Sequence, residues 1–262
     1  MFIIYFPVFS NNRAYMSLLP LVPSLKPFLE DYLPRPGSNK PFVTLTYAQS
    51  LDSRIAAKPG EQTKISHLET KTMTHYIRSK HDGIMVGIGT VLADDPKLNC
   101  RFEADDGHIS TPRPVILDPT GKWVYNKSQL RSVCDDNKGL APFILIDDTV
   151  TPSNEDIEVI EKQGGAFVKL PLLSSSNRID NWKVILAKLF ELGIKSIMIE
   201  GGASIINDLL IYNEVVDSLI ITIGPVFLGK DGVEVSPSKH ADLIDIKWWQ
   251  GIQDSVLCAR LT

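Results

Sequence analysis

The chain has 262 residues, of which 44% are hydrophobic and 22% charged, a composition typical of a globular protein with a sizeable core. Its net charge of −4 provides no basic field and argues against a nucleic-acid partner. The apolar start is too short to span a bilayer and lacks the basic region of a signal peptide, so no membrane association is expected. Cys100, Cys134 and Cys258 form no C-x-x-C pair, which predicts a reducing, cytoplasmic location.

Residues 1–40 are predicted to be a Pro-rich, partly disordered N-terminal extension, and residues 41–262 to be a single domain. The segment from Ser17 to Lys40 contains five prolines and a possible short helix at residues 25–33, so we expect a lead-in rather than core. Met16 is a second plausible start, and residues 1–15 are interpreted as disordered or optional.

The patterns that follow predict strands alternating with helices. A helix is expected at residues 67–79, with Ser66 and Glu69 as a capping box. Such alternation indicates βαβ units and a mostly parallel sheet, and two late strands with almost no helix between them predict an antiparallel C-terminal edge. The expected strands are residues 42–48, 83–86, 113–118, 142–147, 197–199, 218–224 and 255–261, and further helices are expected at 154–163, at 181–192 and from 203.

Two of the expected strands end in glycine turns that lead into helices. One turn begins at Gly87, and the other is Glu200-Gly201-Gly202. Backbone N–H groups at such a turn favour a phosphate, whereas the alternative is that the glycines only allow a tight turn. Gly87 and Gly89 match the start of G-x-G-x-x-G, but Leu92 replaces the third glycine, which excludes a regular Rossmann site. If their strands are neighbours, the two turns would grip one dinucleotide from both sides.

Several polar residues follow the first turn. Thr90 offers a hydroxyl there, with helix capping as its alternative role. Asp94, Asp95, Asn99 and Arg101 lie close behind, and Arg78 comes from the preceding helix. Carboxylates and an amide hold sugar hydroxyls and a guanidinium binds phosphate, so together these side chains suit a phosphosugar. Each of them taken alone is as well explained as a solvated surface residue.

No metal site is predicted. His67, His75 and His81 do not share a helix face, and the chain contains no H-E-x-x-H. His67-Leu68-Glu69 matches half of a zinc deaminase signature, but no P-C-x-x-C follows it.

Three motifs in the same order resemble the riboflavin-biosynthesis reductases, and most closely the fungal members. They are Thr44–Ala56, Asp82–Arg101 and Met198–Ala203, and the resemblance extends from about Pro41 to the C-terminus. It implies a three-layer α/β/α fold similar to dihydrofolate reductase, a homodimer and NADPH as the cofactor. It also implies the reaction, in which hydride passes to C1′ of the opened ribosyl group of a phosphoribosylamino-pyrimidine.

The resemblance also implies roles for residues at the matching positions. Glu200 and Asp94 are the candidate proton donors, with water as an alternative. The bacterial pattern has Gly and Lys where this chain has Ser53 and Arg54, so the rigid, planar guanidinium of Arg54 replaces a flexible lysine ammonium group. The expected cofactor contacts are Gly87, Gly89, Thr90, Asp94, Gly201, Gly202, Ala203, Ser204 and Ile205, and the expected substrate contacts are Ser50, Asp52, Arg54, Arg78, Asn99, Arg101 and Glu200.

Two other functions are compatible with these motifs. A dihydrofolate-type pterin reductase would need no phosphate site, and a nucleotide-binding sensor would keep the turns without turnover.

Overall fold

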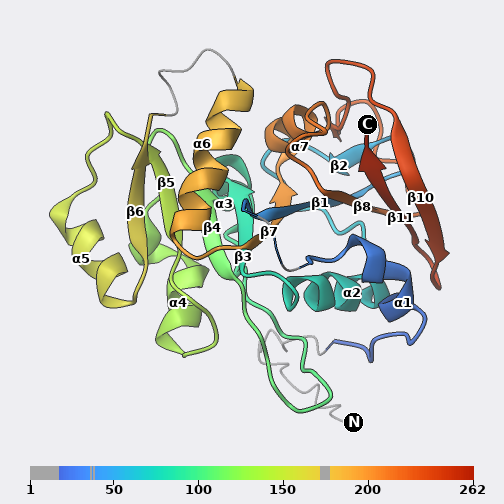
Figure 1. Cartoon of the computed structure of the whole chain (residues 1–262), viewed down its shortest axis with the longest axis horizontal. Helices are drawn as coiled ribbons and strands as arrows, with labels where there is room; N and C mark the ends of the chain where they lie inside the picture. The colour runs from blue at the N-terminus through green and yellow to red at the C-terminus, as the bar shows by residue number, and fades with distance from the viewer. Residues whose placement is uncertain (1–17, 36, 38, 172–177) are drawn as a thin grey trace, which may run out of the picture.

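A computed structural model of the chain describes residues 18–35, 37, 39–171 and 178–262, so residues 1–15, expected to be disordered or optional, lie outside the described residues. Its centre is a nine-stranded sheet of order β10-β11-β8-β1-β7-β3-β4-β5-β6 (Figure 1). The strands of this sheet are β1 (Phe42–Gln49), β3 (Gly83–Gly87), β4 (Arg113–Leu117), β5 (Phe143–Asp147), β6 (Ala166–Leu170), β7 (Ser196–Gly201), β8 (Ser218–Ile223), β10 (Leu243–Gln250) and β11 (Ser255–Leu261).

The strands from β8 to β6 are all parallel to their neighbours. At the other edge, β11 is antiparallel to β8, and β10 is antiparallel to β11. The predicted parallel centre with an antiparallel C-terminal edge is therefore confirmed. A second, two-stranded sheet pairs β2 (Arg54–Ala56) with β9 (Val233–Glu234).

Helices cover both faces of the large sheet, which makes three layers (Figure 1). In β7, Ile197 and Ile199 pack with α6 and α7, while Met198 points to the opposite face and packs with α1 and α2. On that opposite face, α3, α4 and α5 cover β3, β4 and β5. The helices are α1 (Leu25–Leu29), α2 (Leu68–Arg78), α3 (Ile88–Asp94), α4 (Gln129–Asp135), α5 (Asn154–Lys162), α6 (Arg178–Glu191) and α7 (Ala203–Leu209), with short 3₁₀ helices η1 (Glu30–Tyr32) and η2 (Tyr125–Lys127).

The strands buried on both faces were predicted correctly because they are continuous apolar runs. The sequence-based prediction did not include α4, β2, β6, β9 or β10. For β10 the reason is its place at the edge of the sheet, where residues on both faces are exposed or half-buried and no alternation of polarity develops.

The N-terminus of α2 differs from the predicted capping box. The N-cap is His67, whose Nδ1 accepts from the Glu69 backbone N–H, and Ser66 has no such role. The buried carboxylate of Asp254 accepts from the His67 N–H at 2.7 Å and from the Thr70 hydroxyl. Glu69 instead accepts from the backbone N–H of Ile252. The β10–β11 turn thus binds the N-cap residue and the first turn of α2, which local sequence cannot reveal.

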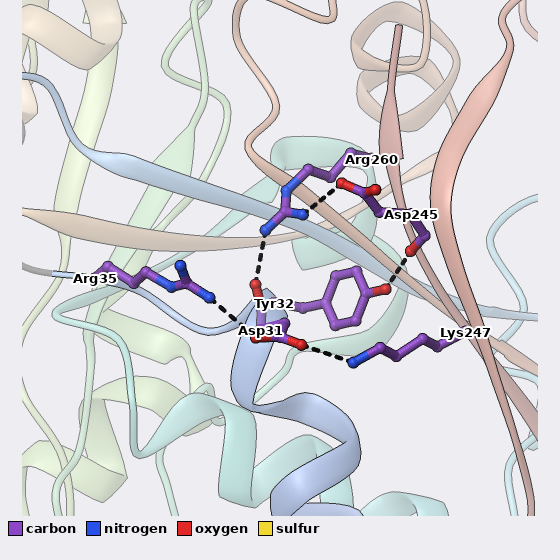
Figure 2. A network of polar contacts seen from close by, with 6 residues as sticks. All are labelled: Asp31, Tyr32, Arg35, Asp245, Lys247 and Arg260. Carbon is purple, nitrogen blue, oxygen red and sulfur yellow. Dashed lines mark hydrogen bonds and ion pairs between the residues drawn. The ribbon is translucent and has the colours of Figure 1, made fainter.

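The segment before β1 was expected to be a lead-in, and this is wrong for residues 25–32. Leu25 and Leu29 are fully buried, and Tyr32 is 1% exposed in the cluster that packs α2 on the sheet. Figure 2 shows the Tyr32 ring between Lys247 and Arg260, with its hydroxyl donating to the carbonyl of Asp245. Proline content placed this segment outside the core, but its three apolar side chains cover a face of the sheet that is otherwise open.

Asp31 extends the same network to the edge strands. It accepts from Lys247 at 2.7 Å and from Arg35 at 3.1 Å, while its backbone carbonyl accepts from Arg260 (Figure 2). The hydrogen bond and positive charge of Lys247 lower the pKa of the Asp31 carboxyl. These contacts fasten η1 to β10 and β11.

We expect Tyr32→Ala to lower the free energy of unfolding by about 3–5 kcal/mol, because it empties a buried ring site. Tyr32→Phe keeps the ring and loses one hydrogen bond, which costs about 1 kcal/mol. Urea denaturation of both variants measures the difference. Equal stability of Tyr32→Ala and the unmodified chain would mean that residues 25–32 are not part of the core.

Candidate active site

The two glycine turns lie side by side because their strands are neighbours. β3 and β7 are parallel, with Val86 opposite Gly201. A Cβ on Gly87 would lie 2.8 Å from Cδ1 of Ile205, and a Cβ on Gly202 would lie 3.0 Å from the Thr90 hydroxyl. The expectation that both turns meet at one edge of the sheet is therefore confirmed.

Gly201 is the position in these turns where only glycine fits easily. Its φ of 104° lies in the left-handed region, and a Cβ there would lie 2.7 Å from Cδ1 of Ile206. The peptide bond between Gly201 and Gly202 is cis. The turn places the start of α7 directly against the turn after β3.

A cavity of about 710 Å³ opens at this junction. Of the expected cofactor contacts, all but Gly201 line it, and so does Glu200. The cavity therefore gathers residues from the ends of β3 and β7 and from the first turns of α3 and α7.

Other parts of the cavity wall were not predicted from the sequence. Tyr47 of β1, Leu117 at the end of β4 and Pro119 after it contribute to the wall, together with residues 59–61, 63 and 65–66, which lead into α2. Burial raises the pKa of the Tyr47 hydroxyl, which therefore stays protonated. Of these wall residues, only Tyr47 lies in a motif on which the resemblance rests.

Glu200 forms a two-pronged ion pair with Arg78. Nε and Nη2 of the guanidinium lie 2.8 Å and 2.7 Å from the two carboxylate oxygens, and the side chains are 15% and 19% exposed. The third nitrogen, Nη1, donates to the backbone carbonyl of Asn99 at 3.1 Å. Arg78 thus fixes the carboxylate at the cavity wall and also fastens the loop after α3.

Asp94 also places a carboxyl in the cavity, near the C-terminus of α3. It is half-buried, and burial raises the pKa of its carboxyl. Within the described residues it makes no hydrogen bond or ion pair. A half-buried carboxyl without a charged partner keeps its proton to higher pH than an exposed one, and this property suits a proton donor.

Asn99 and Arg101 line a second cavity of about 790 Å³ instead of the first. The Asn99 amide donates to the carbonyl of Lys138 at 3.1 Å. Serine, threonine, histidine and lysine side chains also face this cavity, so its wall is rich in hydrogen-bond donors. The polar residues concerned are Asn99, Arg101, His108, Ser110, Thr111, Asn137 and Lys138.

The Arg78 side chain links the walls of the two cavities. Glu200 lines the first cavity and Asn99 the second, and one guanidinium contacts both residues. Of the expected substrate contacts, Glu200 therefore lines the first cavity and Asn99 and Arg101 line the second, with Arg78 bound to both Glu200 and Asn99.

Ser50 and Asp52 line neither cavity among the described residues and instead fasten two loops together. Asp52 accepts from Ser50 Oγ at 2.5 Å and from the backbone N–H groups of Leu228 and Gly229 at 3.0 Å and 2.7 Å. These hydrogen bonds, led by that of Ser50, lower the pKa of Asp52 to about 2. The carboxylate is therefore ionised at neutral pH and holds the β1–β2 turn against the loop after β8.

Ser53 and Arg54 occupy the positions at which the chain departs from the bacterial pattern. Ser53 has φ of 57°, a conformation that glycine adopts more readily. Arg54 forms a 3.0 Å ion pair with Glu234 and donates to the Gly229 carbonyl at 3.3 Å. Its guanidinium thus links β2 to β9.

Among the described residues, no group of three or more histidine, cysteine, aspartate or glutamate side chains is placed to hold a metal ion. In the same part of the chain, every helix is too short or too polar to cross a membrane.

Comparison with known proteins relates this geometry to a family. The model of the RibD C-terminal domain matches residues 41–257. A protein of Debaryomyces hansenii named 2,5-diamino-6-ribosylamino-4(3H)-pyrimidinone 5′-phosphate reductase is 85% identical, covering 94% of this chain and all of the relative. The Saccharomyces cerevisiae protein of the same name is 47% identical, covering 94% of this chain and 99% of the relative.

A solved structure extends the comparison to three dimensions. The S. cerevisiae riboflavin biosynthesis reductase Rib7 superimposes with a TM-score of 0.76 at 41% identity, covering 91% of this chain and all of that one. Because the family model spans most of the chain and the relatives are covered almost end to end, this protein belongs to the RibD C-terminal domain family of riboflavin-biosynthesis reductases.

Proposed function

We propose that this chain reduces 2,5-diamino-6-ribosylamino-4(3H)-pyrimidinone 5′-phosphate to the ribitylamino product, with NADPH as hydride donor and C1′ as hydride acceptor. The observation that carries the proposal is the cavity between the two glycine turns, which also contains the Arg78-bound carboxylate of Glu200. The 85% identity to a reductase of that name supports the substrate.

A nicotinamide cofactor fits the first cavity. Gly202 and Thr90 line it close together, and Ala203, Ser204 and Ile205 continue the same wall. Without a Cβ on Gly202, the backbone N–H groups of this turn suit a diphosphate. When bound, the nicotinamide supplies the hydride. The protein holds the acceptor carbon beside it and keeps that region out of bulk water.

The substrate is proposed to lie across Arg78. The ribosyl group sits in the first cavity beside Glu200 and Asp94, while its phosphate reaches the donor-rich second cavity and Arg101. A guanidinium binds phosphate through two parallel N–H groups. Since one guanidinium contacts both walls, a phosphosugar is proposed to reach from one cavity to the other.

The reaction also needs a proton. In the opened imine form of the sugar, hydride adds to C1′ and a proton goes to the attached nitrogen, which yields the amine. Asp94 is the proposed donor, because its carboxyl is half-buried with a raised pKa. Both oxygens of Glu200 already accept from Arg78, so Glu200 is assigned to hold the substrate.

Loss of NADPH absorbance with the phosphorylated pyrimidinone tests the reaction directly. Turnover with a pterin but not with this substrate would identify a dihydrofolate-type reductase. Tight NADPH binding without any turnover would identify a nucleotide-binding sensor.

The protein is further proposed to be a cytoplasmic homodimer. Ile244, Ile246 and Trp248 of the edge strand β10 are 47%, 50% and 61% exposed, and such an edge favours association. The free thiols of Cys100, Cys134 and Cys258 fit a reducing compartment. Sedimentation at twice the chain mass would support the dimer, and a monomer at micromolar concentration would contradict it.

Arg101→Ala is expected to raise the KM for the substrate about 10- to 100-fold, through loss of a charged hydrogen bond of roughly 1.5–3 kcal/mol. NADPH affinity should be nearly unchanged. Lys239→Ala, which removes an equal charge from an exposed loop, serves as the control. An unaltered KM would remove Arg101 from the site.

Gly202→Val should abolish NADPH binding, because its side chain would crowd the Thr90 hydroxyl and the space for the cofactor. Gly202→Ala is expected to cause a smaller loss. Fluorescence titration with NADPH measures both affinities, and circular dichroism verifies that the variants are folded. A folded Gly202→Val variant with normal NADPH affinity would contradict the proposed cofactor site.

Asp94→Asn should lower kcat by about 10²- to 10⁴-fold, the usual effect of losing a general acid. Because the donor must be protonated, kcat of the unmodified enzyme should fall as pH rises through the raised pKa of Asp94, and the variant should lose this dependence. Asp95→Asn is the matched control, since Asp95 accepts from the Gln129 backbone N–H and does not line the first cavity. Normal turnover by Asp94→Asn would assign the proton to another donor.

A further inference from the structure

His75 contacts the loop that contains the proposed phosphate ligand. It lies on α2, one turn before Arg78, and is 4% exposed. Its Nε2 lies 3.0 Å from Nη2 of Arg101, and its Nδ1 lies 3.2 Å from the backbone N of Arg101. Its own carbonyl accepts from the Cys100 thiol at 3.2 Å.

These contacts require a neutral imidazole. A protonated ring donates from both nitrogens and would face the N–H groups of Arg101 without a lone pair to offer. Burial, followed by the positive charges of Arg78, Arg101 and Lys71, lowers the pKa of His75 to about 2. The ring is therefore neutral at every pH at which the protein is expected to work.

A neutral imidazole has one lone pair available for hydrogen bonding, while Arg101 presents N–H groups to both ring nitrogens. With the proton on Nδ1, Nε2 accepts from the guanidinium. With the proton on Nε2, Nδ1 accepts from the backbone N–H. The ring thus supports the guanidinium or the main chain of Arg101, but not both at once.

The main chain of this loop has other supports. Arg78 donates to the carbonyl of Asn99, and the Cys100 thiol contacts a backbone carbonyl that any residue at position 75 would supply. The contact between Nε2 and the guanidinium, at the wall of the second cavity, is the shorter of the two, 3.0 Å against 3.2 Å. A hydrogen bond from a charged donor is also roughly twice as strong as a neutral one. The contribution specific to a histidine side chain is therefore made at the guanidinium.

We propose that His75 is a positioning residue that accepts a hydrogen bond from the Arg101 guanidinium through Nε2 and sets its orientation toward the substrate phosphate. This inference rests on the proposed function, in which Arg101 binds that phosphate. His75 itself does not touch the reacting atoms.

Two substitutions separate the two ring nitrogens. Counted in bonds from Cβ, the amide oxygen of Asn corresponds to Nδ1 and that of Gln to Nε2. His75→Gln therefore keeps an acceptor for the guanidinium, and His75→Asn keeps one for the backbone N–H. His75→Leu keeps neither.

Steady-state kinetics with the phosphorylated pyrimidinone test the proposal. His75→Leu and His75→Asn should raise KM about 3- to 10-fold, the loss of one hydrogen bond, with kcat within about 2-fold. His75→Gln should restore KM to within about 2-fold of the unmodified value. Rescue by Asn instead of Gln, or an unchanged KM in His75→Leu, would overturn the proposal.

A double-mutant cycle shows whether His75 acts through Arg101. In an Arg101→Ala background, His75→Leu should have no further effect on KM, and an additional loss of the same size would overturn the proposal. If Arg101→Ala alone leaves KM unchanged, the phosphate assignment fails first and His75 loses its proposed role with it. If Arg101→Ala raises KM and His75→Leu does not, only the role of His75 is wrong.

Thr72→Val is the control for general damage to α2. The Thr72 hydroxyl is equally buried and donates to the carbonyls of Leu19 and Leu68, away from the loop of Arg101. This variant should lose stability and keep its KM. A rise in its KM matching that of His75→Leu would attribute the effect to helix stability and overturn the proposal.

Discussion

The parallel pairing of β3 with β7 is the constraint on which the site depends. Parallel neighbours end at the same edge of a sheet, so the turn at Gly87 and the turn at Gly201 necessarily open side by side. The near contact between Gly202 and Thr90 follows from this pairing, and so does the cavity that the two turns enclose. A different strand order with the same local motifs would leave each glycine turn isolated.

Arg78 connects this edge of the sheet to the loop after α3. Its guanidinium binds both oxygens of Glu200 on β7 and the carbonyl of Asn99 in the loop after α3. Because this ion pair is mostly buried and all three nitrogens are used, it fixes the two cavities relative to each other. The polar side chains of the site are thereby divided between the cavity at the two glycine turns and the donor-rich second cavity, and Arg78 of α2 contacts a residue of each.

The pattern of apolar residues predicted a strand correctly where both faces of that strand are buried. The β7 run of Ile197, Met198 and Ile199 is apolar on both faces, and the structure buries it between two helical layers. The same pattern failed where contacts with a segment far along the chain decide how a helix is capped or which residues are buried. The N-cap residue of α2, His67, donates its backbone N–H to Asp254, which lies 187 residues further along the chain, and Tyr32 packs between Lys247 and Arg260. Strand β10 was missed because an edge strand has no fully buried face.

The sequence by itself determined the alternation of strands and helices, the two glycine turns and the set of polar residues near them, because these depend on periodicity and on backbone conformations that glycine permits. Only the tertiary structure decided how those polar residues divide. Asp94 and Glu200 face the first cavity, Asn99 and Arg101 face the second, and Asp52 is occupied in fastening loops. Which side chains share a cavity depends on strand order and on long-range contacts, and neither is recorded in the spacing of residues along the chain.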